Sequence, residues 1–335
     1  MKSFIFQRTQ SEFYTNYCII QLLSQHYGTK IISYPRVKNE FTRAILSVFV
    51  AFRILPQLFR NDTLIAQFPP KFEEIPSLIL CQKLRRKTIF IVHDLDHLRG
   101  IKNTGLRFFR DPQGLKMLRN SQVVIQDGPL QEYLETLGVK QRASFEIWPY
   151  LLLSRHEKTT NSFSINDKYI STKIIYAGNL DFQKSAFLAE VEKLRFKFFL
   201  YGKLSGAIQQ TKWITIMNSF RDGSPPAFPD YAFGLVWDGD SILKLSGVYG
   251  EYSKMNLPAK LSLYIACEIP VIVSNQSAVA QYVKTNQIGI TVDSLFDIPK
   301  QFNINDWNTY KRNITRYSDQ VRKGFHLVES LKDLI

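Results

Sequence analysis

The sequence has few cysteines and no long apolar run. Its three cysteines are far apart in the 335 residues and lie in apolar segments: Cys18, Cys81 and Cys267. Three thiols cannot all pair, which excludes a disulfide-stapled scaffold and favours buried free cysteines in a reducing compartment. The longest apolar run, residues 44–52, falls well short of the roughly 18 residues that a membrane span requires. We therefore expect no spanning helix.

Acidic residues are also scarce compared with basic ones. There are 43 Lys and Arg against 29 Asp and Glu, which gives a net charge of +14. Such a balance predicts an anionic partner: nucleic acid, acidic lipid or a phosphorylated small molecule. No known nucleic-acid-binding module is visible, and the basic cluster at 83–119 lacks regular aromatic interleaving. A non-enzymatic nucleic-acid-binding protein is therefore the remote alternative.

Short apolar runs rich in β-branched residues alternate with helical patterns along the chain. Strands are expected at 2–6, 30–33, 63–68, 87–93, 122–126, 145–148, 173–177, 197–201, 233–237, 270–273 and 289–292. Several of these runs are apolar throughout, as is typical of parallel strands buried on both faces. The pattern predicts an α/β protein with doubly wound sheets.

A polar stretch divides the alternation into two halves. We expect an N-terminal domain at 1–154, a linker at 155–172 and a C-terminal domain at 173–317. The last residues, 318–335, are helical in character and could pack back on the first domain. Ligands of such sheets bind at the carboxyl ends of the strands.

A cluster of acid/base groups follows the apolar strand at 87–93. His93, Asp94 and Asp96 lie within four residues of one another, where α/β enzymes place reactive groups. Carboxylates and imidazoles suit general acid/base catalysis. The alternative is that they only cap the turn that follows. No second cluster is suited to complete a metal coordination sphere with them.

Glycine and acidic residues follow two strands of the second half. In Tyr-Ala-Gly-Asn-Leu, Gly178 would let the backbone approach a phosphate, and Lys184 follows in the next turn. This turn lacks the full dinucleotide-binding pattern, and a plain tight turn is equally compatible with it. After the strand at 233–237, Asp238 and Asp240 suit sugar hydroxyls, although an Asx turn without a ligand is the alternative.

The segment Asn-Leu-Pro-Ala-Lys predicts an anion site at a helix start. Pro258 can open a helix, and Lys260 would then project from its first turn, where the helix dipole already favours anions. The arrangement would hold a diphosphate without a metal. A surface lysine is the alternative interpretation.

Residues 43–60 form a basic and apolar segment. It could rest on an acidic bilayer surface. Packing as a core helix between strands is the favoured interpretation, with a kink at Pro56.

The segments HDLDHLRG, YAGNL, FGLVWDGDS and NLPAKLSLYIACEIPVIV, in this order, resemble the bacterial β-1,6-galactofuranosyltransferases of O-antigen assembly. The wider group includes glucosyltransferases that modify adhesins. The resemblance implies a GT-B fold, with two Rossmann-like domains facing across a cleft. It also implies a hexosyltransferase of lipopolysaccharide biosynthesis that inverts the anomeric centre and uses no metal or cofactor, with the UDP-sugar as co-substrate.

The resemblance also implies partners and residue roles. The donor would be UDP-galactofuranose, with UDP-glucose or UDP-galactopyranose as alternatives, and the acceptor a lipid-linked oligosaccharide. We expect a cytoplasmic protein, peripheral on the acidic inner leaflet, with homo-oligomerisation left open. Asp94 is the expected base, with Asp96 and His93 beside it, and Asp238 and Asp240 would bind the sugar. Lys260, Lys184 and Tyr201 would contact UDP, together with Thr15, Asn16, Gly178, Asn179, Asn256, Pro258, Ala259, Leu261 and Ser262.

Overall fold

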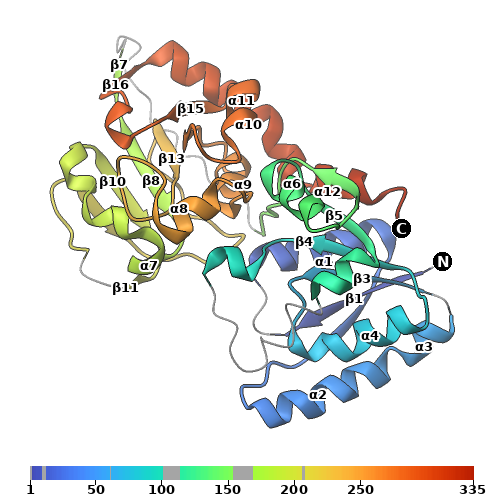
Figure 1. The fold of residues 1–335 in the computed structure, drawn as a ribbon. Coiled ribbons are helices and arrows are strands. Elements are labelled where there is room, and N and C mark those ends of the chain that lie inside the picture. Colours follow the sequence, from blue (N-terminus) through green and yellow to red (C-terminus); the bar gives the residue numbers. More distant parts are fainter. Residues whose placement is uncertain (1, 10–12, 61, 101–113, 154–168, 206–207) are drawn as a thin grey trace. The chain divides into compact units, whose positions relative to one another are not determined.

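The computed structural model describes residues 2–9, 13–60, 62–100, 114–153, 169–205 and 208–335. The chain forms two compact units (Figure 1). Unit 1 comprises 1–149 and 324–335, and unit 2 comprises 150–323. The expected boundaries lie a few residues away from these. Most of the expected linker at 155–172 lies outside the described residues, and its last part forms a strand of unit 2.

Unit 1 is built on a parallel six-stranded sheet in the order β2-β1-β3-β4-β5-β6. Its strands are β1 (Ser3–Arg8), β2 (Lys30–Tyr34), β3 (Thr63–Phe68), β4 (Thr88–Val92), β5 (Gln122–Gln126) and β6 (Gln141–Phe145). Strand order reverses beside β1, where Ile5 lies opposite Ile31 on one side and Ile65 on the other. β3 and β4 are buried along their whole length, as the apolar residues that make up most of each strand predict.

The prediction of a strand at 145–148 is wrong. The sheet strand is β6, which ends at Phe145, and the residues after it leave the sheet. Ile147 and Trp148 are nevertheless buried, because Trp148 packs its ring against Phe145 and His93. Burial of apolar residues outside a strand produced the same sequence pattern as a strand.

The helices of unit 1 are α1 (Tyr14–Tyr27), α2 (Glu40–Arg53), α3 (Leu55–Phe59), α4 (Ile75–Lys83), α6 (Pro129–Thr136) and α12 (Phe325–Leu331). Short 3-10 turns are η1 (Phe72–Glu74) and η2 (Asp96–Arg99). α2 and α3 separate at Ile54, just before Pro56, as the proline predicts. α12 comes from the far end of the chain and packs against α1 and β6.

The favoured interpretation of 43–60 as a core helix is wrong. α2 buries only Ser47 and Val50, and most of its large apolar side chains are exposed. Among the described residues, the helical stretch Glu40–Phe59 alone is long and apolar enough to cross a membrane, a criterion that many core helices and signal sequences also meet. The three cysteines are free and buried, as expected.

Unit 2 is built on a second parallel six-stranded sheet, in the order β12-β10-β8-β13-β14-β15. Its strands are β8 (Lys173–Ala177), β10 (Lys197–Tyr201), β12 (Ile214–Met217), β13 (Ala232–Val236), β14 (Val271–Ser274) and β15 (Gly289–Val292). Two-stranded pairs are β9 (Leu180–Asp181) with β11 (Leu204–Ser205) and β7 (Tyr169–Ser171) with β16 (Gln301–Asn303). Strand order reverses between β8 and β13, which are adjacent.

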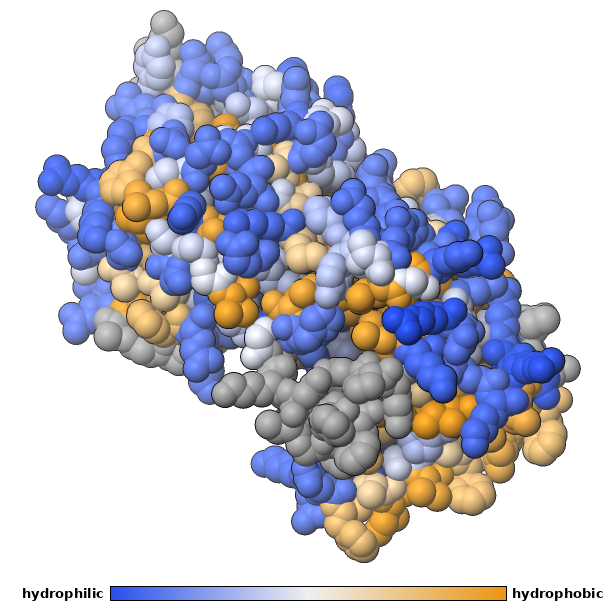
Figure 2. Space-filling view, in the orientation of Figure 1, coloured by the Kyte–Doolittle hydropathy of each residue, from blue (hydrophilic) through white to orange (hydrophobic). Residues whose placement is uncertain are grey.

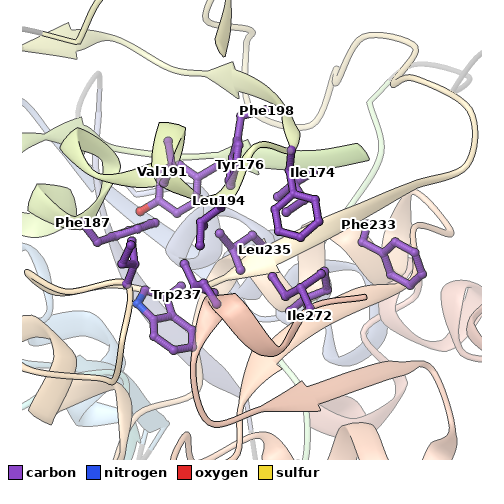
Figure 3. Close-up of a cluster of buried hydrophobic side chains, with 14 of the residues drawn as sticks. Ile174, Tyr176, Phe187, Val191, Leu194, Phe198, Phe233, Leu235, Trp237 and Ile272 are labelled. Carbon is purple, nitrogen blue, oxygen red and sulfur yellow. The ribbon is translucent and has the colours of Figure 1, made fainter. Parts of the chain in front are cut away.

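The helices of unit 2 are α7 (Phe182–Ser185), α8 (Gly247–Ser253), α9 (Ala259–Ala266), α10 (Ala280–Asn286) and α11 (Ile304–Arg322), with the 3-10 turns η3 (Ala186–Ala189), η4 (Val191–Leu194) and η5 (Leu295–Asp297). Its core is aromatic and aliphatic, and Trp237, Phe198 and Phe233 are fully buried in it (Figure 3). α11 ends before Gly324, which has φ +62 and starts α12. Only the last part of the expected helical end therefore belongs to unit 1.

Candidate active site

The carboxyl ends of β8 and β13 carry the polar groups of unit 2. In open α/β sheets, ligands bind where the strand order reverses. Gly178 and Asn179 follow β8 directly, and both are exposed. Asp238 follows β13 two residues after its end. The structure thus brings two separate sequence motifs to one edge of the sheet.

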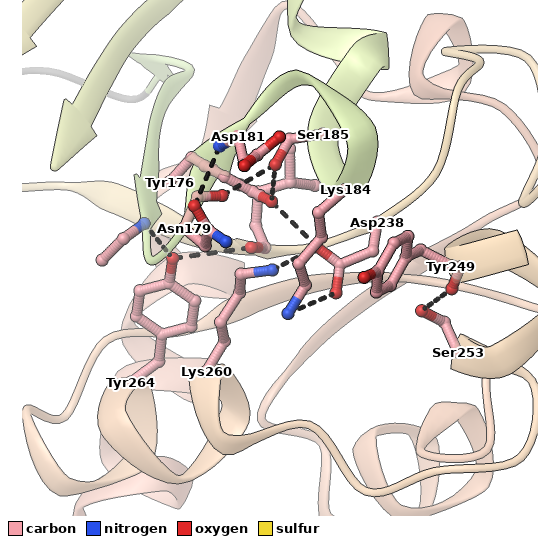
Figure 4. A network of polar contacts seen from close by, with 12 residues as sticks. Tyr176, Asn179, Asp181, Lys184, Ser185, Asp238, Tyr249, Ser253, Lys260 and Tyr264 are labelled. Carbon is pink, nitrogen blue, oxygen red and sulfur yellow. Dashed lines mark hydrogen bonds and ion pairs between the residues drawn. The ribbon is translucent and has the colours of Figure 1, made fainter. Parts of the chain in front are cut away.

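Two lysines converge on Asp238 (Figure 4). Lys260 Nζ lies 2.5 Å from Asp238 Oδ1, and Lys184 Nζ lies 3.7 Å from Oδ2. The Tyr176 hydroxyl donates to Oδ1 at 2.9 Å and contacts Ser185 Oγ at 3.1 Å. Lys260 Nζ is also 4.5 Å from the centre of the Tyr176 ring, a cation–π distance. Lys260 and Lys184, expected at a phosphate site, therefore share one carboxylate.

Burial and charge act in opposite directions on this cluster. Burial alone would raise the pKa of Asp238, but Lys260 and Lys184 hold the pKa of this carboxyl below its usual value. Burial lowers the pKa of Lys260 to about 8, although the Asp238 charge opposes the shift. We place the pair in its ionised form near neutral pH, because both ions lose water and each compensates the other.

The close approach of the Lys260 side chain to the backbone explains why residue 178 is a glycine. Its φ is +153, and a Cβ there would lie 3.0 Å from Lys260 Cε. Glycine therefore lets the lysine stem run beneath the turn that follows β8. Lys260 itself lies in the first turn of α9, which Pro258 precedes. The lysine is 8% exposed, and the turn above it faces solvent.

Tyr264 fixes α9 against the sheet. Its hydroxyl accepts a hydrogen bond from the Ala177 backbone N–H at 2.9 Å. A Cβ at Gly234 would lie 2.4 Å from the Tyr264 ring, so the glycine in the apolar β13 strand makes room for this ring. Tyr264 therefore determines where Lys260 stands relative to β8.

The acidic residues expected to bind sugar have different surroundings. Asp238 is 8% exposed and already pairs with Lys260 and Lys184, so a hydroxyl would have to compete with them. Asp240 is exposed and accepts a short hydrogen bond from Ser246 Oγ in the loop before α8. Its contact with a sugar remains a prediction.

The other residues expected to contact the UDP-sugar differ in their burial and contacts. Tyr201 ends β10, and its carbonyl accepts from the Gly178 N–H at 2.9 Å, but its ring packs against Phe220 and Phe228. Leu261 is fully buried, and the buried Ser262 hydroxyl has no hydrogen-bond partner among the described residues. The remaining members are more accessible: Ala259 and Asn179 are exposed, and Asn256 and Pro258 are half-buried.

The carboxyl edge of the unit 1 sheet holds the expected catalytic cluster. His93 follows β4, stacks on Trp148 with ring centres 4.6 Å apart, and contacts Gln67 Oε1 through Nε2 at 2.7 Å. Burial lowers its pKa to about 4, so the ring is neutral at pH 7. Asp94 is partly exposed and accepts a 2.9 Å hydrogen bond from Arg99. Asp96 is 9% exposed and begins η2.

A small pocket lies where the strand order of unit 1 reverses. It is lined by Phe6, Asn16, Ala66, Gln67, Pro69, Lys71 and Glu74. Gln67 donates through Nε2 to the Asn16 carbonyl at 3.4 Å, while its Oε1 meets His93. Thr15 is half-buried in the first turn of α1 beside Asn16. The structure therefore brings Asn16 and His93 near the same residue, Gln67.

Three residues that make polar contacts in these two clusters were not predicted from the sequence: Tyr176, Tyr264 and Gln67. All lie in apolar runs that indicate core, and their partners are distant in sequence. Asp238 is 62 residues from Tyr176. A polar tip on an otherwise buried aromatic ring is the signal that could have pointed to them, because buried hydroxyls need partners.

Within the described part of the chain, no group of three or more His, Cys, Asp or Glu side chains could hold a metal ion. The positive charges at the carboxyl edge of the unit 2 sheet are the ammonium groups of Lys184 and Lys260. Such an edge can bind an anion through ammonium groups and through backbone N–H groups of the exposed Gly178 turn.

Two doubly wound units in one chain form the architecture that the GT-B glycosyltransferases share. Residues 174–334 match the family model "Glucosyltransferase 3-like, C-terminal domain". Along 338 aligned residues, the chain is 27% identical to the β-1,6-galactofuranosyltransferase WbbI of Escherichia coli, covering 98% of this chain and 96% of that one. The sequence resemblance is therefore supported at the level of a related glycosyltransferase.

Solved structures support the fold. The chain is similar to Anabaena HepE, crystallised with UDP and glucose, with a TM-score of 0.60, 10% identity and coverage of 99% and 100% of the two chains. It is also similar to a Thermosynechococcus elongatus sucrose-phosphate synthase (TM-score 0.53, 13% identity, coverage 99% and 94%). A third is the lipopolysaccharide outer core galactosyltransferase WaaB (TM-score 0.50, 10% identity, coverage 98% and 95%).

Proposed function

We propose that the chain transfers galactofuranose from UDP-galactofuranose to a hydroxyl of a lipid-linked sugar in surface polysaccharide biosynthesis. The observation that carries this proposal is the pair Lys260 and Lys184 around Asp238 at the unit 2 switch point. A diphosphate is the kind of anion that two converging ammonium groups attract. The galactofuranose donor rests on the relationship to the Escherichia coli enzyme.

The proposed reaction is a single displacement with inversion. The acceptor hydroxyl attacks the anomeric carbon, its proton passes to the Asp94 carboxylate, and the bond from that carbon to the UDP oxygen breaks. Lys260 and Lys184 would stabilise the negative charge that develops on UDP. Asp94 is preferred to Asp96 because its carboxylate is more exposed, and the neutral, low-pKa His93 is a weak base. His93 would instead hold Gln67 in place.

The family match indicates a second candidate for the sugar donor. The model that fits residues 174–334 is named for a glucosyltransferase, and UDP-glucose carries the same diphosphate as UDP-galactofuranose. UDP-galactopyranose is the remaining candidate. The lysine cluster contacts the part that these donors share, so it does not distinguish among them.

UDP release from a panel of UDP-sugars tests the function. The protein would be incubated with UDP-galactofuranose, UDP-glucose or UDP-galactopyranose, a membrane extract as acceptor source, and no added metal. We expect release from UDP-galactofuranose. Lys260→Ala should abolish it, whereas Lys284→Ala, an exposed lysine of the same unit, should not. Release from UDP-glucose alone would change the donor, and absence of both turnover and UDP binding would overturn the enzyme assignment.

Asp94→Asn tests the proposed base. The variant should lose transfer by roughly a hundredfold or more, because the attacking hydroxyl keeps its proton. UDP binding to unit 2 should be unchanged, as measured by titration calorimetry. Asp127→Asn offers a matched control, because Asp127 follows β5 in the same unit. Transfer that survives in Asp94→Asn would place the base elsewhere, with Asp96→Asn as the next variant to measure.

A further inference from the structure

The outer face of α2 and α3 is an exposed apolar stripe. Its members are Phe41 (73% exposed), Ile45 (56%), Val48 (53%), Phe49 (56%), Phe52 (64%) and Phe59 (84%). Spacings of three and four residues place those of α2 on one side of the helix. Figure 2 shows orange surface at the lower end of the view, where α2 and α3 lie in Figure 1.

Among the described residues of unit 1, packing does not require the stripe. The opposite side of the helix already packs on η1 and α4, and it buries Ser47, Val50 and Ile54. Arg43 belongs to that side, because its guanidinium pairs with the buried Glu73 at 2.6 Å. A contiguous apolar face left exposed after the helix has packed indicates a contact with something outside the chain.

The charge around the stripe is positive. Arg36 and Lys38 are exposed just before α2, and Arg53 and Arg60 are exposed at the ends of α2 and α3. Glu40 is the only acidic residue from 36 to 60. The apolar stripe therefore has basic residues at both ends, and the whole chain carries +14.

We propose that the α2–α3 stripe is a docking surface for a lipid bilayer with anionic headgroups. Aromatic and aliphatic side chains would enter the boundary between headgroups and acyl chains, and the flanking arginines and lysines would meet lipid phosphates. The partner's chemistry follows from this combination, because an uncharged apolar partner would leave the basic residues unmatched.

The helix lies on the bilayer and does not span it. α2 and α3 connect β2 to β3, and both strands pair in parallel with β1. Both ends of the helical stretch must therefore return to one sheet on the same side of a membrane. Only one long side of the stretch is apolar and exposed, as an interfacial helix requires.

A second copy of the chain fits this face less well. A two-fold dimer places the same patch of both subunits together. The basic residues at the ends of the stripe would then add like charges to that interface, which opposes association. An anionic surface has the opposite charge. The proposal does not depend on the proposed function, because bilayer binding requires neither donor nor turnover.

Sedimentation with vesicles tests the proposal. The protein would be mixed with vesicles of phosphatidylcholine alone, or of phosphatidylcholine with phosphatidylglycerol, and the bound fraction measured over a salt series. We expect binding to the anionic vesicles that weakens as salt increases. The triple variant Ile45→Gln, Phe49→Gln and Phe52→Gln should bind on the order of a hundredfold more weakly.

Matched variants separate the stripe from general surface apolarity. The triple variant Leu243→Gln, Phe296→Gln and Phe325→Gln changes exposed apolar residues elsewhere and should bind as the unchanged protein does. Arg53→Gln with Arg60→Gln should weaken binding roughly tenfold or more and reduce its salt dependence. The double variant Lys323→Gln and Lys332→Gln, which changes two exposed lysines elsewhere, should leave vesicle binding unchanged.

Phe49→Trp gives a measurement that keeps the stripe apolar. Its additional fluorescence should shift to shorter wavelength with anionic vesicles. Failure of the unchanged protein to bind anionic vesicles, or equal binding by the stripe variant with an unchanged melting temperature, would overturn the proposal. A dimer that the stripe variant dissociates, without vesicle binding, would make a second copy the occupant instead.

Discussion

At the scale of single residues, we propose that the cluster around Asp238 acts as a charge-compensated anion site. Without a ligand, the Asp238 carboxylate neutralises part of the charge of Lys260 and Lys184. A diphosphate that enters would compete with this carboxylate for the same ammonium groups. Because burial lowers the pKa of Lys260 to about 8, its charge depends on pH within the working range of many enzymes.

The depressed pKa of Lys260 predicts proton uptake when UDP binds. Near pH 8 the buried lysine is partly neutral, and a bound diphosphate favours its charged form, so binding should take up a fraction of a proton. Near pH 6.5 the lysine is protonated before and after binding, and uptake from this group should vanish. UDP affinity should therefore fall as the pH rises above about 8. Calorimetric titrations in buffers of different ionisation enthalpy measure this uptake.

Asp238→Asn provides the internal comparison for this prediction. Removing the carboxylate removes the charge that raises the pKa of Lys260, so the pH range of uptake should move to lower values. Lys284→Ala, at an exposed site, should leave the range unchanged. Uptake that is the same at pH 6.5 and pH 8, or that persists in Lys260→Ala, would contradict the role given to Lys260.

Sequence reasoning found the two lysines and Gly178 but not the contacts between them. Local patterns show that Lys260 stands at a helix start and that Gly178 ends a strand. They do not show that Asp238 meets both Lys260 and Lys184, because that meeting depends on the order of β8 and β13 in the sheet. For the same reason, no role for Tyr176 or Tyr264 was predicted from the sequence.

At the scale of secondary-structure elements, the contact between β13 and α9 positions the lysine cluster. Gly234 and Tyr264 form this contact, and a Cβ at 234 would lie 2.4 Å from the ring. Gly234→Ala should destabilise unit 2 by about 1–3 kcal/mol through overpacking, and should weaken UDP binding because α9 carries Lys260. Thermal unfolding and UDP titration measure the two effects. Normal stability and normal UDP affinity together would contradict this account.

The strands were predicted better than the orientation of the helices. β3 and β5 were predicted at their observed bounds, because a short, largely apolar run between turn signals leaves few alternatives. In α2, by contrast, apolar residues occur on more than one side of the helix. The pattern alone could not show that Val50 faces the core while Phe49 and Phe52 face outward. The packing of α2 on η1 and α4, which cover one side of the helix, decides this.

At the scale of the whole molecule, the chain crosses from unit 1 to unit 2 and returns. α12 completes unit 1 although it is encoded after all of unit 2. It buries Leu327 and Leu331, and the Tyr27 hydroxyl donates to the Val328 carbonyl at 2.5 Å. Gly324 also contributes, since a Cβ there would lie 2.2 Å from Leu22 in α1. Unit 1 is therefore complete only when the end of the chain has been made.

Leu331→Ala should destabilise unit 1 selectively, because it leaves a cavity where α12 packs. The expected loss is about 2–5 kcal/mol. Unit 2 has its own sheet and core, so calorimetry should show the unit 1 transition moving to lower temperature while the other stays in place. Added UDP should raise only the unit 2 transition in both proteins, because ligand binding stabilises the unit that holds the site. A single unfolding transition that moves to lower temperature in Leu331→Ala would mean that the two units unfold together. An effect of UDP on the unit 1 transition alone would place the nucleotide site away from Lys260.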